Sequence, residues 1–582
     1  MTLKISDAFK LAGSDHDKTV SPEKTIETFK TKCKSAGLSI LDKTQRIDNN
    51  RLGIPVYFSI CGHDAEKITG TKKQMGKGAT PALAEASAVM ELAERFSIYS
   101  FMENQDNFIY ETYDNVKQDA IPFELIAKSV NDESNEEIKV LEKIFSTVKF
   151  KWTKAYNISQ NKEMLIPMDW FFMINEFNGS SAGNCNEEAV CQGACEIVER
   201  HVSALISRKK KELIFIDHKS VTNPSTADLI NKFTRAGIKL YINDFSLDTG
   251  ICTIGILAFD PSTFPHTSEI VWTAGTAPEP DKALSRALTE TAQLAGDFNT
   301  ASNYMASGLP KFKSLKEAAF IIDPPNSKTV ENKTPESKTP ENKTPENKTL
   351  KSKKCKTVKL SDLPNISHMN IKDEISEITK ALKQSGQELL TVNTTDNRLG
   401  VPAFYTIIPG ANFRERAENS SIAMFLSKHI FENNPARKAL TQLDKIDEKL
   451  PDRYYIKFYQ GMCRLSMSKP DKALKYFESA MELDPANQDI PSISSYTGVC
   501  LKELGQYKKA ILILETGIKA DKEREDIYNL MGFCNFMLKQ HEKSISCFEK
   551  VLELNPGSAI DHASIASNHR ELGHKKQAIK YY

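Results

Sequence analysis

The chain has 582 residues, enough for about three to five domains of ordinary size. Its 77 Lys and Arg residues balance 76 Asp and Glu residues, and a net charge of +1 gives no general attraction to nucleic acid. Hydrophobic residues make up 40% and charged residues 26%, as in an ordinary folded protein. No apolar run approaches the roughly 20 residues of a membrane-spanning helix, and the N-terminus lacks the apolar stretch of a secretory signal. Eleven cysteines without a CxxC pair predict reduced thiols and a cytoplasmic location.

The first part of the chain, to about residue 320, alternates between predicted strands and predicted helices. Apolar and β-branched runs predict strands at 54–60, 150–156, 164–167, 239–242, 251–259 and 270–274. Longer stretches with strong acid content predict helices at 81–100, 186–208 and 281–296. This alternation is typical of an α/β or α+β domain, and not of a clean doubly wound sheet.

The first of these helices has a clear start signal and a narrow polar stripe. Thr80 is a suitable cap, and Pro81 fits the first helical turn. Because a helix turns about 100° per residue, Ser87, Glu91 and Glu94 fall within roughly 60° of one another.

A lysine between two glycines, Gly76-Lys77-Gly78, precedes this helix. It is not a Walker A loop, because that loop needs Ser or Thr after the lysine and a different spacing from the first glycine. Lys77 can still reach a phosphate, and a tight turn before a helix explains the glycines equally well.

The second and third helices carry similar stripes. The second presents a stripe within an arc of about 80°, formed by Glu188, Gln192, Glu196 and Glu199. The third presents a stripe within about 60°, formed by Arg286, Glu290 and Gln293.

Two interpretations of the stripes are open. For one helix alone, a solvated face with Glu and Arg paired along it is the commoner case. However, the flanking positions are mostly small or apolar, and Glu91 with Glu94 places like charges one turn apart without an intervening Lys. Glu196 with Glu199 does the same, which is unfavourable unless a cation binds. Carboxylates at this density with few His suit Mg²⁺, which usually comes with a phosphate, so the three stripes favour a Mg²⁺–nucleotide site.

Between residues 326 and 356 the sequence is of low complexity. It repeats Lys-Thr-Pro-Glu-Asn and has almost no large apolar residue. Such a stretch cannot bury enough surface to offset the loss of chain entropy, so we expect a disordered insertion. A predicted helix at 373–385 and extended segments at 389–392 and 399–410 follow. The insertion therefore interrupts a domain that extends from residue 1 to 415.

From about Arg437 the chain is continuously helical and repeats itself. Small residues recur every 34 to 37 positions, at Gly461, Gly498, Gly532 and Ala566. Each precedes a second small residue and then a large one, which are Ala473 and Phe477, Ala510 and Leu514, Ser544 and Phe548, and Ala578 and Tyr582. This pattern resembles the tetratricopeptide repeat, whose small residues let two antiparallel helices touch. The resemblance implies an all-α solenoid over 437–582, after a connecting helix at 416–436.

Taken in chain order, the three stripes resemble the signatures of the YcaO-domain family. The first signature is Gly76-Lys77-Gly78 with Ser87, Glu91, Glu94 and Arg95. The second is Asn184 with Glu188, Glu196, Glu199 and Arg200, and the third is Arg286 with Glu290 and Gln293. The resemblance covers about residues 40–415, including the closing Gly-Val-Pro and Pro-Gly of 400–410. It implies an α/β (α+β) ATP-binding fold without a Walker motif.

The resemblance implies an enzyme that uses ATP and Mg²⁺ to phosphorylate a backbone amide oxygen of a peptide or protein. Phosphate is a much better leaving group than the amide oxygen, and Mg²⁺ neutralises charge during phosphoryl transfer. A nucleophile then attacks the activated amide: a Cys, Ser or Thr side chain gives an azoline, sulfide gives a thioamide and an amine gives an amidine. The repeats resemble those of stand-alone members, which implies thioamide formation or an accessory role in methylthiolation of a ribosomal protein.

Carried over residue by residue, the resemblance implies binding roles for the stripe residues and assigns none to catalysis. The expected ligands of Mg²⁺ and of the ATP phosphates are Glu91, Glu94, Glu188, Glu196 and Glu199. The expected further contacts to the nucleotide are Ser87, Asn184, Gln192 and Arg200, together with Lys77, Arg286 and Glu290.

Other functions remain open. Helices follow Pro409-Gly410, where azoline-forming members end in a Pro-rich tail, so an azoline-forming cyclodehydratase is a secondary hypothesis. A different class is a scaffold that binds ATP structurally and recruits a partner through its repeats. A Mg²⁺-dependent phosphohydrolase fits the signature spacing less well. The expected partners are a protein or peptide substrate, a protein docked on the repeats and a second copy of the chain, without nucleic acid or membrane.

Overall fold

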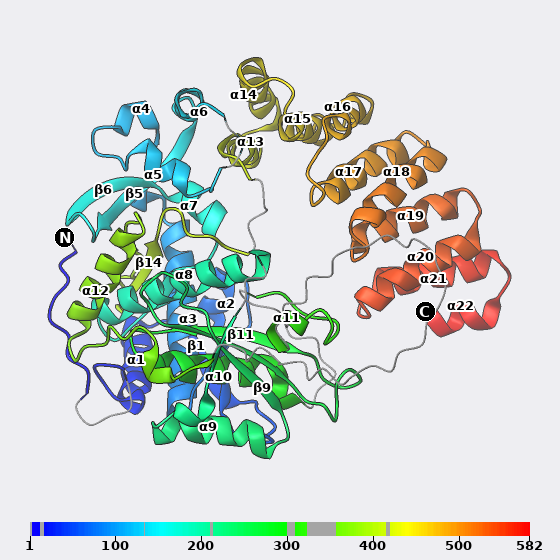
Figure 1. Cartoon of the computed structure of the whole chain (residues 1–582). Coiled ribbons are helices and arrows are strands. Elements are labelled where there is room, and N and C mark those ends of the chain that lie inside the picture. The colour runs from blue at the N-terminus through cyan, green and yellow to red at the C-terminus, as the bar shows by residue number, and fades with distance from the viewer. Residues whose placement is uncertain are drawn as a thin grey trace, which may run out of the picture. The chain divides into compact units, whose positions relative to one another are not determined.

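The computed structural model describes residues 3–11, 17–132, 134, 136–209, 213–298, 309–322, 357–414 and 420–582 (Figure 1). The predicted low-complexity insertion at 326–356 lies outside these residues. The chain divides into two compact units. The first comprises Met1–Glu111, Val116–Ser129 and Phe150–Arg416, and the second comprises Thr112–Asn115, Val130–Lys149 and Ala417–Tyr582. Among the described residues, no helix combines the length and the apolar character needed to cross a bilayer.

In the described part of the chain the strands form three sheets. The first has the order β1-β2-β3 and consists of β1 (Leu41–Arg46), β2 (Val56–Cys61) and β3 (Lys73–Lys77). The second has the order β11-β10-β9-β8-β12 and consists of β8 (Ile214–Ile216), β9 (Lys239–Asp244), β10 (Thr253–Phe259), β11 (Val271–Thr276) and β12 (Thr357–Val358). The third has the order β4-β5-β13-β14-β7 with β6 on β5, and consists of β4 (Ile109–Thr112), β5 (Lys149–Asn157), β6 (Lys162–Pro167), β7 (Ser180–Ala182), β13 (Leu390–Asn393) and β14 (Ala403–Ile407).

The pairing of these strands is mainly antiparallel. For example, β10 runs antiparallel to both β9 and β11, whereas β12 pairs with β8 in parallel. The predicted strands correspond to β2, β5, β6, β9, β10 and β11, so the predicted mixed α and β domain is confirmed.

Three long helices of the first unit each pack on a different sheet. They are α3 (Pro81–Glu103) on β3 and β2, α8 (Asn186–Lys209) on β14 and β7, and α10 (Pro280–Ala295) on β11 and β10. The Thr80 side chain accepts a hydrogen bond from the Leu83 amide, and Pro81 opens α3, as predicted. The other helices of this unit are α1 (Pro22–Ala36), α2 (His63–Thr69), α5 (Phe123–Lys128), α7 (Met168–Asn175), α9 (Pro224–Arg235), α11 (Ala319–Ile322) and α12 (Ile371–Gln384).

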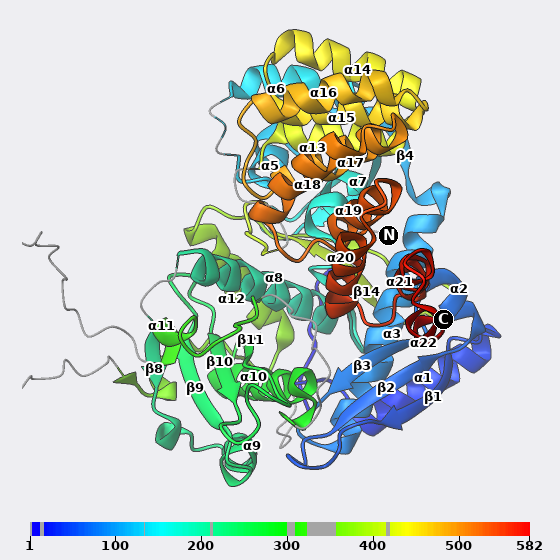
Figure 2. The same cartoon turned by 90° about the vertical axis from the view of Figure 1, so that its right-hand side faces the viewer.

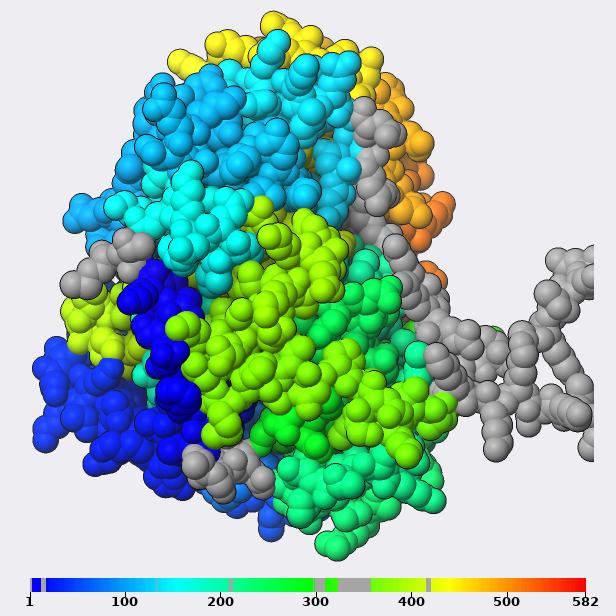
Figure 3. Space-filling view, turned by 60° about the vertical axis from the view of Figure 1, so that its left-hand side comes forward, coloured from blue at the N-terminus to red at the C-terminus, as the bar shows by residue number. Residues whose placement is uncertain are grey.

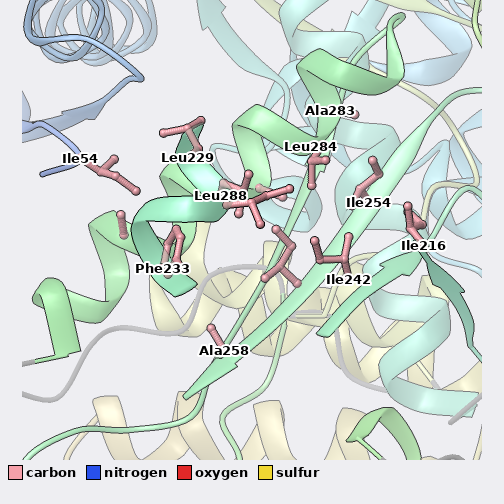
Figure 4. Close-up of a cluster of buried hydrophobic side chains, with 14 of the residues drawn as sticks. Ile54, Ile216, Leu229, Phe233, Ile242, Ile254, Ala258, Ala283, Leu284 and Leu288 are labelled. Atoms are coloured by element: carbon pink, nitrogen blue, oxygen red, sulfur yellow. The ribbon is translucent and has the colours of Figure 1, made fainter. Parts of the chain in front are cut away.

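A buried apolar cluster holds α9 and α10 on one face of the second sheet (Figure 4). Leu229 and Phe233 of α9 meet Leu284 and Leu288 of α10 above Ile254 of β10, and each of these side chains is almost fully buried. Burying a large apolar side chain contributes about 1.5–3 kcal/mol, so this cluster fixes the rotation of α10 about its axis. The apolar side of α10 faces the sheet, and its polar stripe therefore faces away.

The second unit is a succession of helices (Figure 2). Its helices are α4 (Tyr113–Val116, which ends in the first unit), α6 (Ile138–Phe145), α13 (Ile422–Asn433), α14 (Ala436–Lys449), α15 (Tyr454–Ser466), α16 (Pro470–Glu482), α17 (Ile490–Glu503), α18 (Tyr507–Ala520), α19 (Glu525–Met537), α20 (His541–Leu554), α21 (Ala559–Glu571) and α22 (Lys575–Tyr581). The helices from α15 to α22 pair in the order of the predicted repeats, and α13 lies within the predicted connecting segment.

The small residues of the repeats act as predicted. A Cβ atom added to Gly461 would lie 2.7 Å from the Phe477 ring, and one added to Gly532 would lie 2.8 Å from the Phe548 ring. The two helices of a repeat can therefore touch only because glycine has no side chain at these positions. The fourth repeat differs, because Tyr582 is 72% exposed whereas Phe477 is fully buried.

Part of the second unit comes from the first half of the sequence. Glu136, just before α6, accepts hydrogen bonds from Arg453 and from the Tyr455 hydroxyl at 2.8 and 3.1 Å. The Asp132 carboxylate accepts a hydrogen bond from the Ile422 amide at the start of α13. The segment Val130–Lys149 thus packs at the beginning of the helical array.

Candidate functional site

The polar stripes of α3, α8 and α10 line one pocket in the first unit. The pocket has a volume of about 920 Å³. The residues expected to bind nucleotide or metal all line it: Lys77, Ser87, Glu91, Glu94, Asn184, Glu188, Gln192, Glu196, Glu199, Arg200, Arg286 and Glu290. Arg95 and Gln293 line it as well. The structure therefore brings together residues that are more than 200 positions apart in the sequence.

On α3, a single arginine pairs with two carboxylates. Arg95 lies 2.8 Å from Glu91 and 3.2 Å from Glu94. Burial raises the pKa of Glu94 well above its usual value, and the charges of Glu91 and Glu196 raise it further. A further cation placed beside Glu94 would counteract this shift, as the charge of Arg95 already does in part.

On α8, the carboxylates have different partners. Arg200 lies 3.6 Å from Glu196, one helical turn earlier. Burial raises the pKa of Glu196 even though Arg200 and Arg95 oppose that shift. Glu199 accepts a hydrogen bond at 3.1 Å from the amide of Thr276, at the end of β11.

Glu188, at the start of α8, accepts hydrogen bonds on both of its carboxylate oxygens. One oxygen accepts from the amide and the hydroxyl of Thr19, both at 2.6 Å. The other oxygen accepts from the amide and the side chain of Asn184, at 3.0 and 2.8 Å. The Asn184 carbonyl oxygen in turn accepts from the Thr25 hydroxyl, so α1 supports this corner.

The cationic side of the pocket comes from β3 and α10. Lys77 forms an ion pair with Glu290. Burial lowers the pKa of Lys77 to about 8, and the nearby charges of Arg200 and Arg286 act in the same direction. Arg286 donates from Nη1 to the carbonyl oxygen of Thr276 at 3.0 Å, which helps to orient its guanidinium group.

The donor set fits Mg²⁺ together with a polyphosphate. Glu91 and Glu196 raise the pKa of Glu94, and Glu91 also raises that of Glu196, so these carboxylates repel one another and a divalent cation among them would relieve the repulsion. Within the described residues, no three His, Cys, Asp or Glu side chains converge closely enough to hold a metal by themselves. Mg²⁺ does not need such a cage, because it commonly uses one or two carboxylates together with water and substrate phosphates. Lys77, Arg200 and Arg286 line the same pocket and carry the kind of charge that phosphates require.

Several further lining residues belong to no motif that the sequence analysis identified. Asp17, Lys18 and Thr25 reach the pocket from the N-terminal part of the chain, and Asn223 and Thr226 reach it from the start of α9. Asn223 followed by Pro224 is a recognisable helix start, but that pattern carries no information about a ligand. Only the tertiary structure brings these side chains to the stripes.

Comparison with protein families agrees with this site. Residues 75–412, more than half of the chain, match the family described as YcaO cyclodehydratase, ATP- and Mg²⁺-binding. The chain therefore belongs to the YcaO family, and ATP and Mg²⁺ are the cofactors of its first unit. Residues 464–532 and 525–558 match tetratricopeptide repeats, so a YcaO domain is followed by such repeats.

The chain is also similar to curated proteins and to solved structures. A protein of uncharacterized function from Methanothermobacter thermautotrophicus is 24% identical over 68% of this chain and 95% of its own length. The ribosomal protein S12 methylthiotransferase accessory factor YcaO of Escherichia coli is 26% identical over 42% of this chain and 44% of its own length. The structure of YcaO from Methanopyrus kandleri bound with AMPPCP and Mg²⁺ is 18% identical, with a TM-score of 0.50 over 71% of this chain and 95% of that one. A heterocyclase in complex with substrate and cofactor gives a TM-score of 0.54 at 19% identity, over 71% of this chain and 55% of that one.

Proposed function

We propose that this protein uses ATP and Mg²⁺ to activate a backbone amide of a peptide or protein, and that the activated amide is converted to a thioamide. The amide oxygen takes a phosphoryl group from ATP, the sulfur nucleophile adds to the amide carbon, and the oxygen leaves with the phosphate. The observation that carries this proposal is the convergence of three acidic helix stripes, with Lys77 and Arg286, on one pocket of about 920 Å³.

Each group of lining residues has a role in this proposal. Glu91, Glu94, Glu188, Glu196 and Glu199 hold Mg²⁺ and orient the phosphates. Lys77, Arg200 and Arg286 neutralise the phosphate charge that develops during transfer. Ser87, Asn184, Gln192 and Glu290 bind the nucleotide or orient the residues that do. The free thiols of the described residues fit a reducing compartment, and we place this activity in the cytoplasm.

The repeats support a second element of the proposal, which is the recruitment of a protein. Arrays of this type present an extended surface for a partner. The E. coli relative is named as an accessory factor for a ribosomal protein methylthiotransferase. The same ATP-dependent activity could therefore serve as an accessory step in such a modification instead of forming a thioamide. A scaffold that binds ATP without consuming it, and an azoline-forming cyclodehydratase, are the competing functions.

The first experiment tests the nucleotide site. We expect purified protein to bind Mg·ATP in isothermal titration calorimetry. We expect Glu91→Gln and Glu196→Gln each to raise the Kd by about 10- to 100-fold, because each variant loses one or more charge-assisted contacts. Glu85→Gln is the matched control, because Glu85 is on α3 but bonds to Thr44 and Lys30 instead of facing the pocket. Wild-type binding unaffected by both pocket variants would contradict the carboxylate site.

The second experiment distinguishes the chemistry. Peptides and proteins captured on the full chain are incubated with Mg·ATP and sulfide, and then compared by mass spectrometry with those incubated with Glu91→Gln. Exchange of oxygen for sulfur in the captured chain supports thioamide formation, and loss of water identifies azoline formation. ATP binding without ATP consumption or a mass change in any captured chain would leave the scaffold as the function.

A further inference from the structure

The segment Asp17–Val20 enters the pocket from outside the three stripes. Asp17, Lys18 and Val20 all line the cavity. The Lys10 amide donates to the carbonyl oxygen of Met369, and the Leu11 amide donates to the carbonyl oxygen of Lys18. Figure 3 shows the dark blue N-terminal segment lying along the yellow-green part of the chain. The segment Asp17–Val20 is thus a built part of the pocket wall.

The Asp17 carboxylate lies on the guanidinium of Arg286, at 3.2 Å. Although burial raises the pKa of Asp17, the charges of Lys18 and Arg286 outweigh this effect and hold the pKa well below its usual value. Asp17 is therefore charged at every physiological pH. The proposed function assigns Arg286 to a phosphate of ATP. In the structure, the Asp17 carboxylate already lies beside this arginine.

A second contact holds Asp17 in this position. Thr19, two residues later, donates both its amide and its hydroxyl to one oxygen of Glu188. With the two donors from Asn184 on its other oxygen, Glu188 accepts four hydrogen bonds, which is about the full capacity of a carboxylate. The segment Asp17–Val20 therefore contacts two residues of the proposed site. Asp17 contacts Arg286, which is assigned to phosphate, and Thr19 contacts Glu188, which is assigned to Mg²⁺.

We propose that Asp17 is an internal competitor of the ATP phosphates for Arg286, and that the segment Asp17–Val20 is an autoinhibitory contact that nucleotide must displace. The inference rests on the proposed function, because it takes Arg286 as a phosphate-binding residue. Two anions repel each other when they share one guanidinium, so part of the binding free energy of ATP is used to separate Asp17 from Arg286. The contact thereby keeps the affinity for ATP below that of an open pocket.

The opposite role for Asp17 makes an opposite prediction. A carboxylate can also orient an arginine for its ligand, and its removal would then weaken nucleotide binding. The direction of the change in affinity on removing the charge of Asp17 therefore distinguishes competition from positioning.

The test is a titration of the full-length protein with AMPPCP and Mg²⁺, for wild type and Asp17→Asn. We expect a Kd about tenfold lower for Asp17→Asn, because a neutral amide leaves Arg286 available at little change in volume. The matched control is Asp7→Asn, which makes the same charge change earlier in the N-terminal part of the chain, where Asp7 pairs with Lys372 outside the pocket. We expect the Kd of Asp7→Asn to equal that of wild type.

Thr19→Val is the second variant, for the case in which Asp17→Asn fails to fold. It removes one of the two donors to Glu188 and keeps the charge of Asp17, so we expect a smaller decrease in Kd of about two- to threefold. An unchanged or higher Kd in the folded variants, with wild type binding normally, would overturn the autoinhibitory contact alone. Absence of binding in wild type and in every variant would overturn both this inference and the nucleotide part of the proposed function.

Discussion

Lys77 is a pocket residue whose pKa lies close to physiological pH. Its neighbours include Glu290, with which it forms an ion pair, but burial still lowers its pKa to about 8. The ammonium form therefore predominates below pH 8 and is lost as pH rises through that value. Because a phosphate is stabilised by the ammonium form only, nucleotide binding is coupled to this proton.

We expect the affinity for Mg·AMPPCP to be nearly constant from pH 6.5 to 7.5 and to fall above about pH 8, by at most about tenfold per pH unit for one coupled proton. Calorimetric titrations across this range measure the effect. Lys77→Arg is the control, because an arginine stays charged throughout and its affinity profile above pH 8 should be flat. A wild-type profile as flat as that of Lys77→Arg would show that Lys77 does not contact the phosphates.

The glycines beside Lys77 show how far a local pattern can be interpreted. The sequence left open whether they serve a phosphate or a tight turn. The structure gives them a packing role, because a Cβ added to Gly76 would lie 2.1 Å from the Ala88 amide, and one added to Gly78 would lie 2.6 Å from the Ala84 amide. Close packing of β3 on α3 thus requires both glycines and places Lys77 at the pocket.

At the scale of elements, helical periodicity predicted which polar side chains of α3, α8 and α10 share a face, and the three stripes taken together indicated a common site. Side chains spaced at helical intervals share a face whatever the surrounding fold. Local patterns did not reveal the ion pair of Asp17 with Arg286, whose partners are 269 residues apart. They also did not reveal which strands pair, such as β5 with β13, because pairing depends on the whole chain.

The segment around α6 is the clearest case of such a long-range contact. Glu136 has only 2% of its side chain exposed. It binds Arg453, the N-cap residue of α15, and Tyr455 in the first turn of that helix. Glu136 is the buried member of this pair, and its replacement by Gln weakens two hydrogen bonds to a carboxylate that has little access to water. We expect Glu136→Gln to destabilise the helical unit by about 1–3 kcal/mol, measured by chemical denaturation followed by circular dichroism.

The matched control for this substitution is Glu137→Gln. Glu137 is the next residue and is exposed, and its side chain makes no capping hydrogen bond to α6. Its substitution should change the stability by less than about 0.5 kcal/mol. Equal stability of the two variants would show that Glu136 does not hold Val130–Lys149 in the helical array.

At the scale of the whole molecule, the chain contains two units with separate cores. The first has buried clusters around its sheets, such as the one of Leu284 and Leu288, and the second has clusters between successive repeats, such as the one of Ala473 and Phe477. Units with separate cores unfold as separate cooperative transitions when the coupling between them is weak. The lining residues of the nucleotide pocket all belong to the first unit.

These two facts predict how the protein responds to its cofactors on heating. A ligand that binds only the folded state stabilises that state by about 2.7 kcal/mol at a free concentration of 100 times its Kd. We therefore expect two transitions in differential scanning calorimetry, of which Mg·AMPPCP raises the Tm of one and leaves the other unchanged. Glu136→Gln should lower the Tm of the transition that does not respond to nucleotide. A single transition that shifts with both the nucleotide and the substitution would contradict independent units, and would mean that ligand binding in the YcaO domain is energetically coupled to the repeats.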